Sequence, residues 1–99
     1  MRECVVGQIV KSTAGRDKDR FMIVIGLLDD SYALICDGDV RKLNGPKKKK
    51  LKHLAVTNTV VDDIAEKIKA GNKIQNAELR KILRPWNERS SADEMQKEV

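Results

Sequence analysis

The 99-residue chain has few aromatic side chains, which restricts how it can recognise a partner. Phe21, Tyr32 and Trp86 are the only three, and each falls in a different segment that we expect to contribute to a core. Proteins that read unpaired nucleic-acid bases stack them on several exposed rings. With these rings in the core, few remain for stacking, so the composition argues against a reader of unpaired bases.

The groups that support catalysis or metal binding are also scarce. His53 is the only histidine, and the two cysteines, Cys4 and Cys36, lie 32 positions apart and outside any Cys-x-x-Cys pair. A metal site or catalytic centre needs several such groups at suitable spacing, and a phosphate-binding loop needs a glycine-rich motif that this chain lacks. We therefore expect no enzyme, no metal and no cofactor. Both cysteines are expected to pack as small apolar side chains, with a disulfide as the alternative.

Long apolar runs are missing as well. No segment approaches the roughly 20 apolar residues of a membrane-spanning helix. The short apolar stretch near the N-terminus is interrupted at Gly7 and Gln8, so it does not read as a signal peptide. We expect a cytoplasmic protein with reduced cysteines and no membrane partner.

The chain does contain an internal run of positive charge. Residues 41–52 hold seven cations and no acidic residue. Residues 1–56 carry 12 Lys or Arg against 7 Asp or Glu, whereas residues 57–99 carry 8 of each. Concentrated positive charge indicates a polyanionic partner, and nucleic-acid phosphate is the commonest one in a cell. The alternative is a solvated loop or a localisation-like basic patch.

Hydrophobic patterning predicts strands in the first half of the chain and helices in the second. The continuous apolar run 21–28 is typical of a strand buried on both faces, with Gly26 a candidate bulge. Gly15 in the polar loop 13–20 is a candidate for positive φ, and the lysine run is expected to form a loop after the break at 44–46. The other predicted strands cover residues 5–12, 32–36, 39–43 and 53–56.

Two amphipathic helices are predicted after residue 56. Thr59 suits the N-cap of the first and Gly71 the position after its end, while Asn76 suits the start of the second and Pro85 its end. These elements predict a mainly β chain with C-terminal helices, an α+β fold built on a small β-barrel. We expect a barrel at residues 1–56, a helical extension packed on it at 57–86, and a flexible acidic tail at 87–99.

Several motifs of the first half resemble a known family. The segments that carry the resemblance are residues 5–10, 14–17, 21–25, 32–38, 41–42, 46–49 and 52–54. The first three look like the KOW motif, and the whole set is similar to KOW-domain RNA-binding proteins related to eukaryote- and archaeon-type large-subunit ribosomal proteins. Small bacterial relatives share the lysine run before Lys-His-Leu. The resemblance covers about Val5 to Val56 and implies an SH3-like barrel with ribosomal or other structured RNA as its ligand.

Two loops are expected to contact RNA. The lysine run supplies attraction that depends on salt and not on sequence, since each lysine acts as a point charge. In the other loop Gly15 would let the backbone approach RNA, and Arg16 could grip a phosphate or stack on a base; a purely structural loop is the alternative. The predicted RNA-binding residues are Gly15, Arg16, Lys18, Arg20, Arg41, Lys42, Lys47, Lys48, Lys49, Lys50, Lys52 and His53.

The sequence therefore predicts a non-enzymatic RNA-binding protein, monomeric when free, that acts in translation on the ribosome or on other structured RNA. KOW domains also resemble modules of transcription elongation factors, and SH3-like barrels often bind peptides. A protein-interaction or transcription-elongation-type module is accordingly the alternative.

Overall fold

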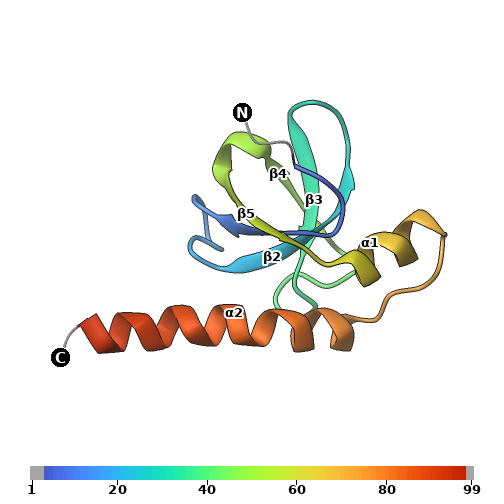
Figure 1. Cartoon of the computed structure of the whole chain (residues 1–99). Coiled ribbons are helices and arrows are strands. Elements are labelled where there is room, and N and C mark those ends of the chain that lie inside the picture. Colours follow the sequence, from blue (N-terminus) through green and yellow to red (C-terminus); the bar gives the residue numbers. More distant parts are fainter. Residues whose placement is uncertain (1–3, 98–99) are drawn as a thin grey trace.

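The computed structural model describes the backbone of residues 4–97 and the side chains as far as Glu88. Five antiparallel strands are followed by two helices, which confirms the predicted α+β class (Figure 1). The strands are β1 (Gln8–Ser12), β2 (Phe21–Leu27), β3 (Tyr32–Cys36), β4 (Lys47–Lys50) and β5 (Leu54–Val60). A short 3-10 turn, η1 (Leu51–His53), joins β4 to β5, and the helices are α1 (Asp62–Lys69) and α2 (Asn76–Lys97).

The strand order β4-β3-β2-β1-β5 leaves β4 and β5 as the two edges of an open sheet. The predicted closed barrel is therefore wrong. Closure would require β4 and β5 to pair along their length. Instead the chain passes from one edge to the other through η1, directly after a β4 of only four residues.

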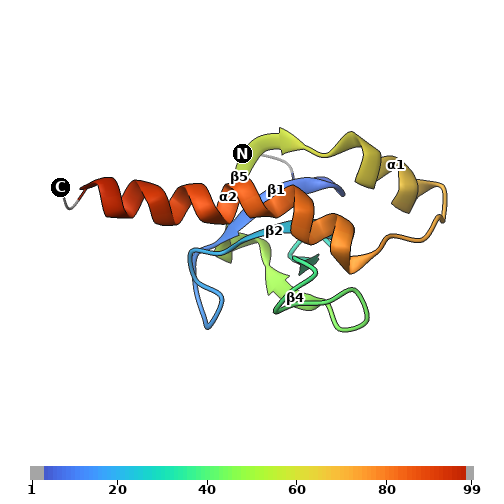
Figure 2. The same ribbon diagram turned by 90° about the horizontal axis from the view of Figure 1, so that it is seen from below.

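The sheet has a core on each face, and β2 contributes to both, as its apolar run predicted. Ile23 belongs to the helix-side cluster, whereas Met22 and Val24 belong to the inner cluster of the curved sheet. The helix-side cluster consists of Ile9, Ile23, Cys36, Ile64, Leu79 and Leu83. The inner cluster consists of Val10, Met22, Val24, Ala33, Ile35 and Leu54. Figure 2 shows α2 crossing the sheet on the helix side.

The lysine run is a strand, contrary to the predicted loop. Lys47 to Lys50 pair antiparallel with β3, from Ile35 opposite Lys47 to Tyr32 opposite Lys50. Lysine has low strand propensity, but an edge strand tolerates it because charge there discourages pairing with another chain. The predicted strand at 39–43 is instead a loop. There the buried Asp37 carboxylate accepts hydrogen bonds from the amides of Asp39 and Arg41 and so satisfies the backbone locally.

β2 and β3, which follow each other in the chain, form a hairpin around residues 29–31. The Asp29 carboxylate accepts hydrogen bonds from the amides of Ser31 and Tyr32, which fixes the turn. The β2–β3 register shifts between Val24 and Gly26, where the bulge was expected.

The helices begin and end differently from the prediction. α1 follows Val61 without a side-chain cap, because Thr59 is still part of β5; Gly71, with φ +76°, does lie just past its end. α2 does not end at Pro85 but continues to Lys97. Proline there removes one helical hydrogen bond, and packing of the adjacent Trp86 on Phe21, with ring centroids 5.3 Å apart, helps to hold the helix. Residues 98 and 99 of the predicted acidic tail lie outside the described residues, and its flexibility stays a prediction.

Hydrogen bonds between side chains of α2 and the backbone of the β3–β4 loop fix the start of the helix. The side-chain oxygen of Asn76 accepts the Leu43 amide at 2.8 Å, so Asn76 ties helix to loop. Arg80 donates from Nη1 to the carbonyl of Gly38 at 2.8 Å. A Cβ at Gly38 would lie 2.2 Å from the Asn76 carbonyl oxygen, so only glycine permits this approach. Farther along, the Asn87 side chain accepts the Phe21 amide at 2.9 Å.

Candidate nucleic-acid interface

The β1–β2 loop, residues 13–20, is held in a defined shape by its own backbone. The amide of Asp19 donates to the Ser12 carbonyl at 2.7 Å, and the Ser12 amide donates to Arg20 at 3.1 Å. Gly15 has φ +84°, as expected, and Asp19 also has a positive φ of 72°. The loop therefore presents Arg16 and Lys18, both exposed, from a fixed base.

The lysine segment lies directly against this loop. Lys49 Nζ donates to the Ala14 carbonyl at 2.6 Å, and the Thr13 amide donates to the His53 carbonyl at 2.9 Å. A Cβ on Gly15 would lie 3.0 Å from Lys49 Nζ. Two segments that are separate in the sequence thus form one continuous surface. We call residues 13–20 together with residues 49–53 the loop–η1 surface.

The four lysines of β4 are divided between the two faces of the sheet. Lys47 and Lys49 lie opposite Ile35 and Ala33, which belong to the inner cluster, and both lysines are half-buried. Residues directly opposite each other in an antiparallel pair share a face, so the lysine stems border this cluster.

Lys48 and Lys50 occupy the other face and are exposed. Lys48 Nζ lies 4.5 Å from the centre of the half-buried Tyr32 ring, a cation–π contact. Lys50 and Lys52 border a hollow of about 390 Å³ whose other lining residues are Asp30, Ser31, Tyr32 and Leu51. The run is therefore two pairs of lysines in different environments and not four equivalent charges.

Two of the predicted RNA-binding arginines are engaged with carboxylates. Arg41 Nε donates to Asp17 at 2.7 Å, which ties the β3–β4 loop to the β1–β2 loop. Arg20 donates from Nε to the Asp37 carboxylate and from Nη2 to Asp39 at 3.1 Å. These pairs position the loops, and a contact of either arginine with RNA stays a prediction.

Asp17 and Asp37 are two carboxylates that organise the loops beside this surface. The Asp17 carboxylate accepts from Arg41 and so joins two loops. Asp37 is 1% exposed and accepts the amides of Asp39 and Arg41, which organises the β3–β4 loop. Buried carboxylates are rare unless paired. The sequence feature that indicates such a role for Asp37 is Asp-Gly-Asp directly after a buried strand.

Five of the remaining predicted site residues carry a charge that no described side chain neutralises. Among the described residues, Arg16, Lys18, Lys42, Lys50 and Lys52 are exposed and form no ion pair. Lys42 is set apart from the others, because the next residue, Leu43, is bound to the start of α2. His53 is half-buried at the end of η1.

Both cysteines are free thiols, as the core interpretation predicted. Burial, together with the adjacent Asp37 carboxylate, raises the pKa of Cys36 to about 12, and burial also raises the pKa of Cys4. Thiols held in the protonated form are poor nucleophiles. No group of three His, Cys, Asp or Glu residues within the described part of the chain could hold a metal ion. Across residues 4–97, no helix combines the length and apolar character needed to cross a membrane.

Comparison with known proteins gives one relevant likeness. No family model matches the chain, so the KOW resemblance has no support from that comparison. Over 72 residues the chain is 26% identical to a Bacillus subtilis (strain 168) protein named "Putative ribosome-binding protein YbzG". The alignment covers 73% of this chain and 97% of that protein. The chain is thus similar, over nearly that protein's whole length, to a protein whose name describes ribosome binding.

Proposed function

We propose that this protein is a non-enzymatic, ribosome-associated protein that binds structured RNA through the loop–η1 surface. The observation that carries the proposal is the convergence of two cationic segments through the Lys49–Ala14 and Thr13–His53 contacts. The likeness to the Bacillus subtilis protein supports the ribosome as the assembly concerned. The sequence motifs and the positive φ of Gly15 support a KOW-type identity for the sheet, as an open relative of the SH3-like fold.

The chemistry of the surface suits phosphate groups. Exposed lysines neutralise phosphates and release counterions, while the guanidinium of Arg16 can bind a phosphate with two parallel hydrogen bonds. Because β4 and the β1–β2 loop are already ordered, little conformational entropy is lost on binding. Phe21 and Trp86 pack on each other, and Tyr32 lies beneath Lys48. The protein accordingly recognises the backbone and shape of folded RNA.

A pair of double variants tests this proposal. K50A/K52A removes two exposed charges from the loop–η1 surface, and K69A/K73A removes two exposed lysines from the end of α1 and the linker after it. Filter binding to purified ribosomes and to a ribosomal RNA hairpin, at several salt concentrations, gives affinity and salt slope. We expect K50A/K52A to weaken binding roughly tenfold and to reduce the log–log salt slope by about two, since each phosphate contact contributes close to one unit.

The control fixes how the result is interpreted. K69A/K73A changes the net charge by the same amount and should retain nearly wild-type affinity. Equal losses in both variants would mean that only total charge matters, and unchanged affinity in K50A/K52A would exclude the loop–η1 surface. A third variant, R16K, keeps the charge but removes the planar fork, so a clear loss there indicates bidentate phosphate binding.

A further inference from the structure

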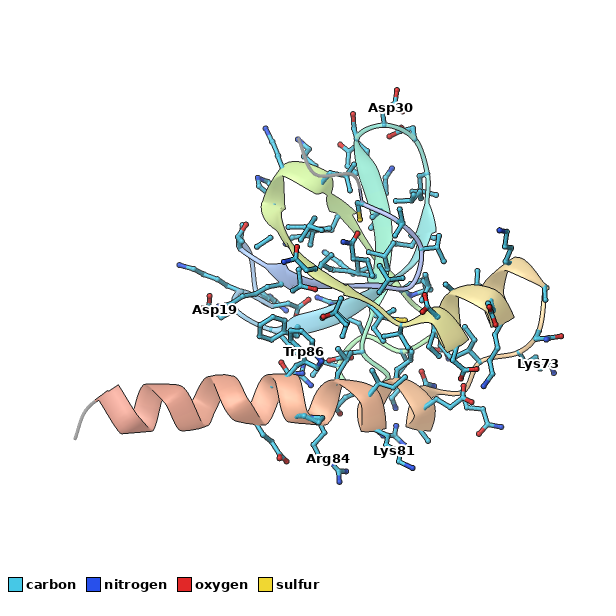
Figure 3. The ribbon with its side chains drawn as sticks, viewed as in Figure 1. Asp19, Asp30, Lys73, Lys81, Arg84 and Trp86 are labelled. Atoms are coloured by element: carbon cyan, nitrogen blue, oxygen red, sulfur yellow. The ribbon has the colours of Figure 1, made fainter. Side chains whose placement is uncertain are left out.

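One face of α2 packs in the core, and another face of the helix is cationic. Leu79 and Leu83 are fully buried against the sheet. Arg80, Lys81 and Arg84 are exposed. In Figure 3, Lys81 and Arg84 point away from the sheet, on the side of the helix opposite to the strands.

The charge on this outer face is not neutralised by the side chains that the structure describes. Lys81 and Arg84 form no ion pair or hydrogen bond there, and Arg80 donates only to the uncharged carbonyl of Gly38. Arg80 and Arg84 also border a hollow that is lined by Asp37, Asp39 and Glu88. Of these acidic residues, Asp37 and Asp39 are engaged by Arg20, and Glu88 forms no ion pair with Arg84. Glu78 is engaged by Lys67 at 2.7 Å. The neutral total of residues 57–99 therefore conceals a local excess of positive charge.

This outer face lies well away from Lys50 and Lys52, which form one end of the loop–η1 surface, and is nearer to its other end, where Arg20 borders the same hollow as Arg80 and Arg84. β3 runs from Tyr32, beside those lysines, to Cys36, which packs against Leu79 and Leu83 on the inner face of α2. The strand spans about 14 Å, and the helix with its side chains adds roughly another 10 Å. In Figure 3, Asp30, near the two lysines, lies at the top of the molecule, whereas Lys81 and Arg84 lie at the bottom, below α2. One short stretch of RNA backbone cannot follow both.

We propose that Arg80, Lys81 and Arg84 form a second RNA-backbone surface, and that the protein bridges two RNA segments. The inference rests on the proposed function and extends it from one contact surface to two. Guanidinium groups at i and i+4 lie about 6 Å apart along one helix face and match the phosphate groups of a polyanion. A helix that binds a membrane surface instead needs a free apolar face, and the apolar face of α2 is occupied by the sheet.

A two-colour experiment tests the bridge. Two RNA hairpins, one with a donor fluorophore and one with an acceptor, are mixed with substoichiometric full-length protein, and energy transfer between them is measured. Wild type should give transfer, and K81A/R84A should lose at least four-fifths of it while still binding a single hairpin. Arg80 is left in place because it fixes α2 to Gly38. Circular dichroism checks that the variant is folded.

The controls separate this inference from the function on which it rests. K69A/K73A removes the same charge and should bridge like wild type. Wild-type transfer in K81A/R84A, or tight single-hairpin binding without transfer in wild type, overturns the bridge and leaves the loop–η1 surface intact. Absence of any hairpin binding by wild type overturns both proposals. Binding of anionic phosphatidylserine vesicles that needs Lys81 and Arg84, without RNA bridging, would assign this face to lipid and also overturn the bridge.

Discussion

At the scale of single residues, Asp37 shows how one buried carboxylate can organise a loop. Its oxygens accept the amides of Asp39 and Arg41 and the guanidinium of Arg20, and its side chain is shielded from water. Charged groups are buried without large cost only when they are paired in this way. The β3–β4 loop, which supports α2 at Gly38 and Leu43, depends on this residue.

Replacing Asp37 should therefore destabilise the protein. We expect D37A to lower the free energy of unfolding by about 1–3 kcal/mol, because it leaves the amides of Asp39 and Arg41 without the carboxylate that accepts from them. D39A removes the exposed partner of the same arginine and should cost less than about 1 kcal/mol. Urea denaturation measures both. Similar losses in the two variants would contradict a special role for the buried carboxylate.

The buried thiol of Cys36 leads to a second prediction at this scale, on how folding stability depends on pH. Its pKa rises from 9.0 to about 12 in the folded protein, because burial and then Asp37 disfavour the thiolate. The folded state therefore holds the proton more tightly than the unfolded state. The stabilisation is complete below about pH 9 and is lost as the pH rises toward 12.

Urea denaturation at pH 7 and pH 10 tests this linkage. Wild type should lose more stability over that interval than C36A, which has no thiol to ionise. Because the two proteins share every other ionisable group, the difference between them is the informative quantity. An identical pH dependence would show that Cys36 does not contribute.

At the scale of elements, the β1–β2 loop and β4 form one unit through Gly15, Ala14 and Lys49. The conformation of Gly15, φ +84°, is unfavourable for residues with a Cβ, and an added Cβ would press on Lys49 Nζ at 3.0 Å. Either effect disturbs the Lys49–Ala14 contact that joins the two cationic segments.

We expect G15A to lower stability by about 1–2 kcal/mol through the left-handed backbone alone. RNA affinity should fall as well, because Lys49 must move. G45A is the matched control, since no atom lies within 4 Å of its added Cβ and its φ is not positive. That substitution should be neutral or slightly stabilising. Thermal denaturation and filter binding measure stability and RNA affinity in both variants. Equal stability and equal affinity in G15A and G45A would contradict the prediction.

At the scale of the whole molecule, the helices and the sheet share the helix-side cluster. Leu79 and Leu83 from α2 and Ile64 from α1 pack with Ile9, Ile23 and Cys36 of the strands. The sequence predicted one unit at residues 1–56 and another at residues 57–86. In the fold, these two segments bury each other's apolar surface. Removing such surface from water is what makes a small domain stable.

One cooperative transition is expected from this shared core. Trp86 is the only tryptophan and lies on α2, so its fluorescence follows helix docking, whereas far-UV circular dichroism follows the whole backbone. The two signals should give the same urea midpoint. L79A should lower both midpoints together, with a loss of about 2–5 kcal/mol. Separate transitions would indicate that residues 57–86 unfold independently of the sheet.

Much of the local structure could be predicted from short-range patterns. The strand at Phe21–Leu27, the turn at Asp29, the bulge near Gly26 and the positive φ of Gly15 and Gly71 all follow from the identity of a few neighbouring residues. The lysine strand could not be predicted this way. Its pairing with β3 is a long-range interaction that offsets the low strand propensity of lysine.

The sequence by itself determined the α+β class, the order of most elements and the presence of a basic segment, because composition, periodicity and turn residues act locally. Tertiary structure alone decided which charges are available. It pairs Arg20 and Arg41 with carboxylates and divides the β4 lysines between two faces. Among the side chains that the structure describes, it leaves Lys81 and Arg84 of α2 without an ion pair. The physical reason is that charge neutralisation depends on distances across the fold, which contacts between strands, loops and helices set and residue order does not.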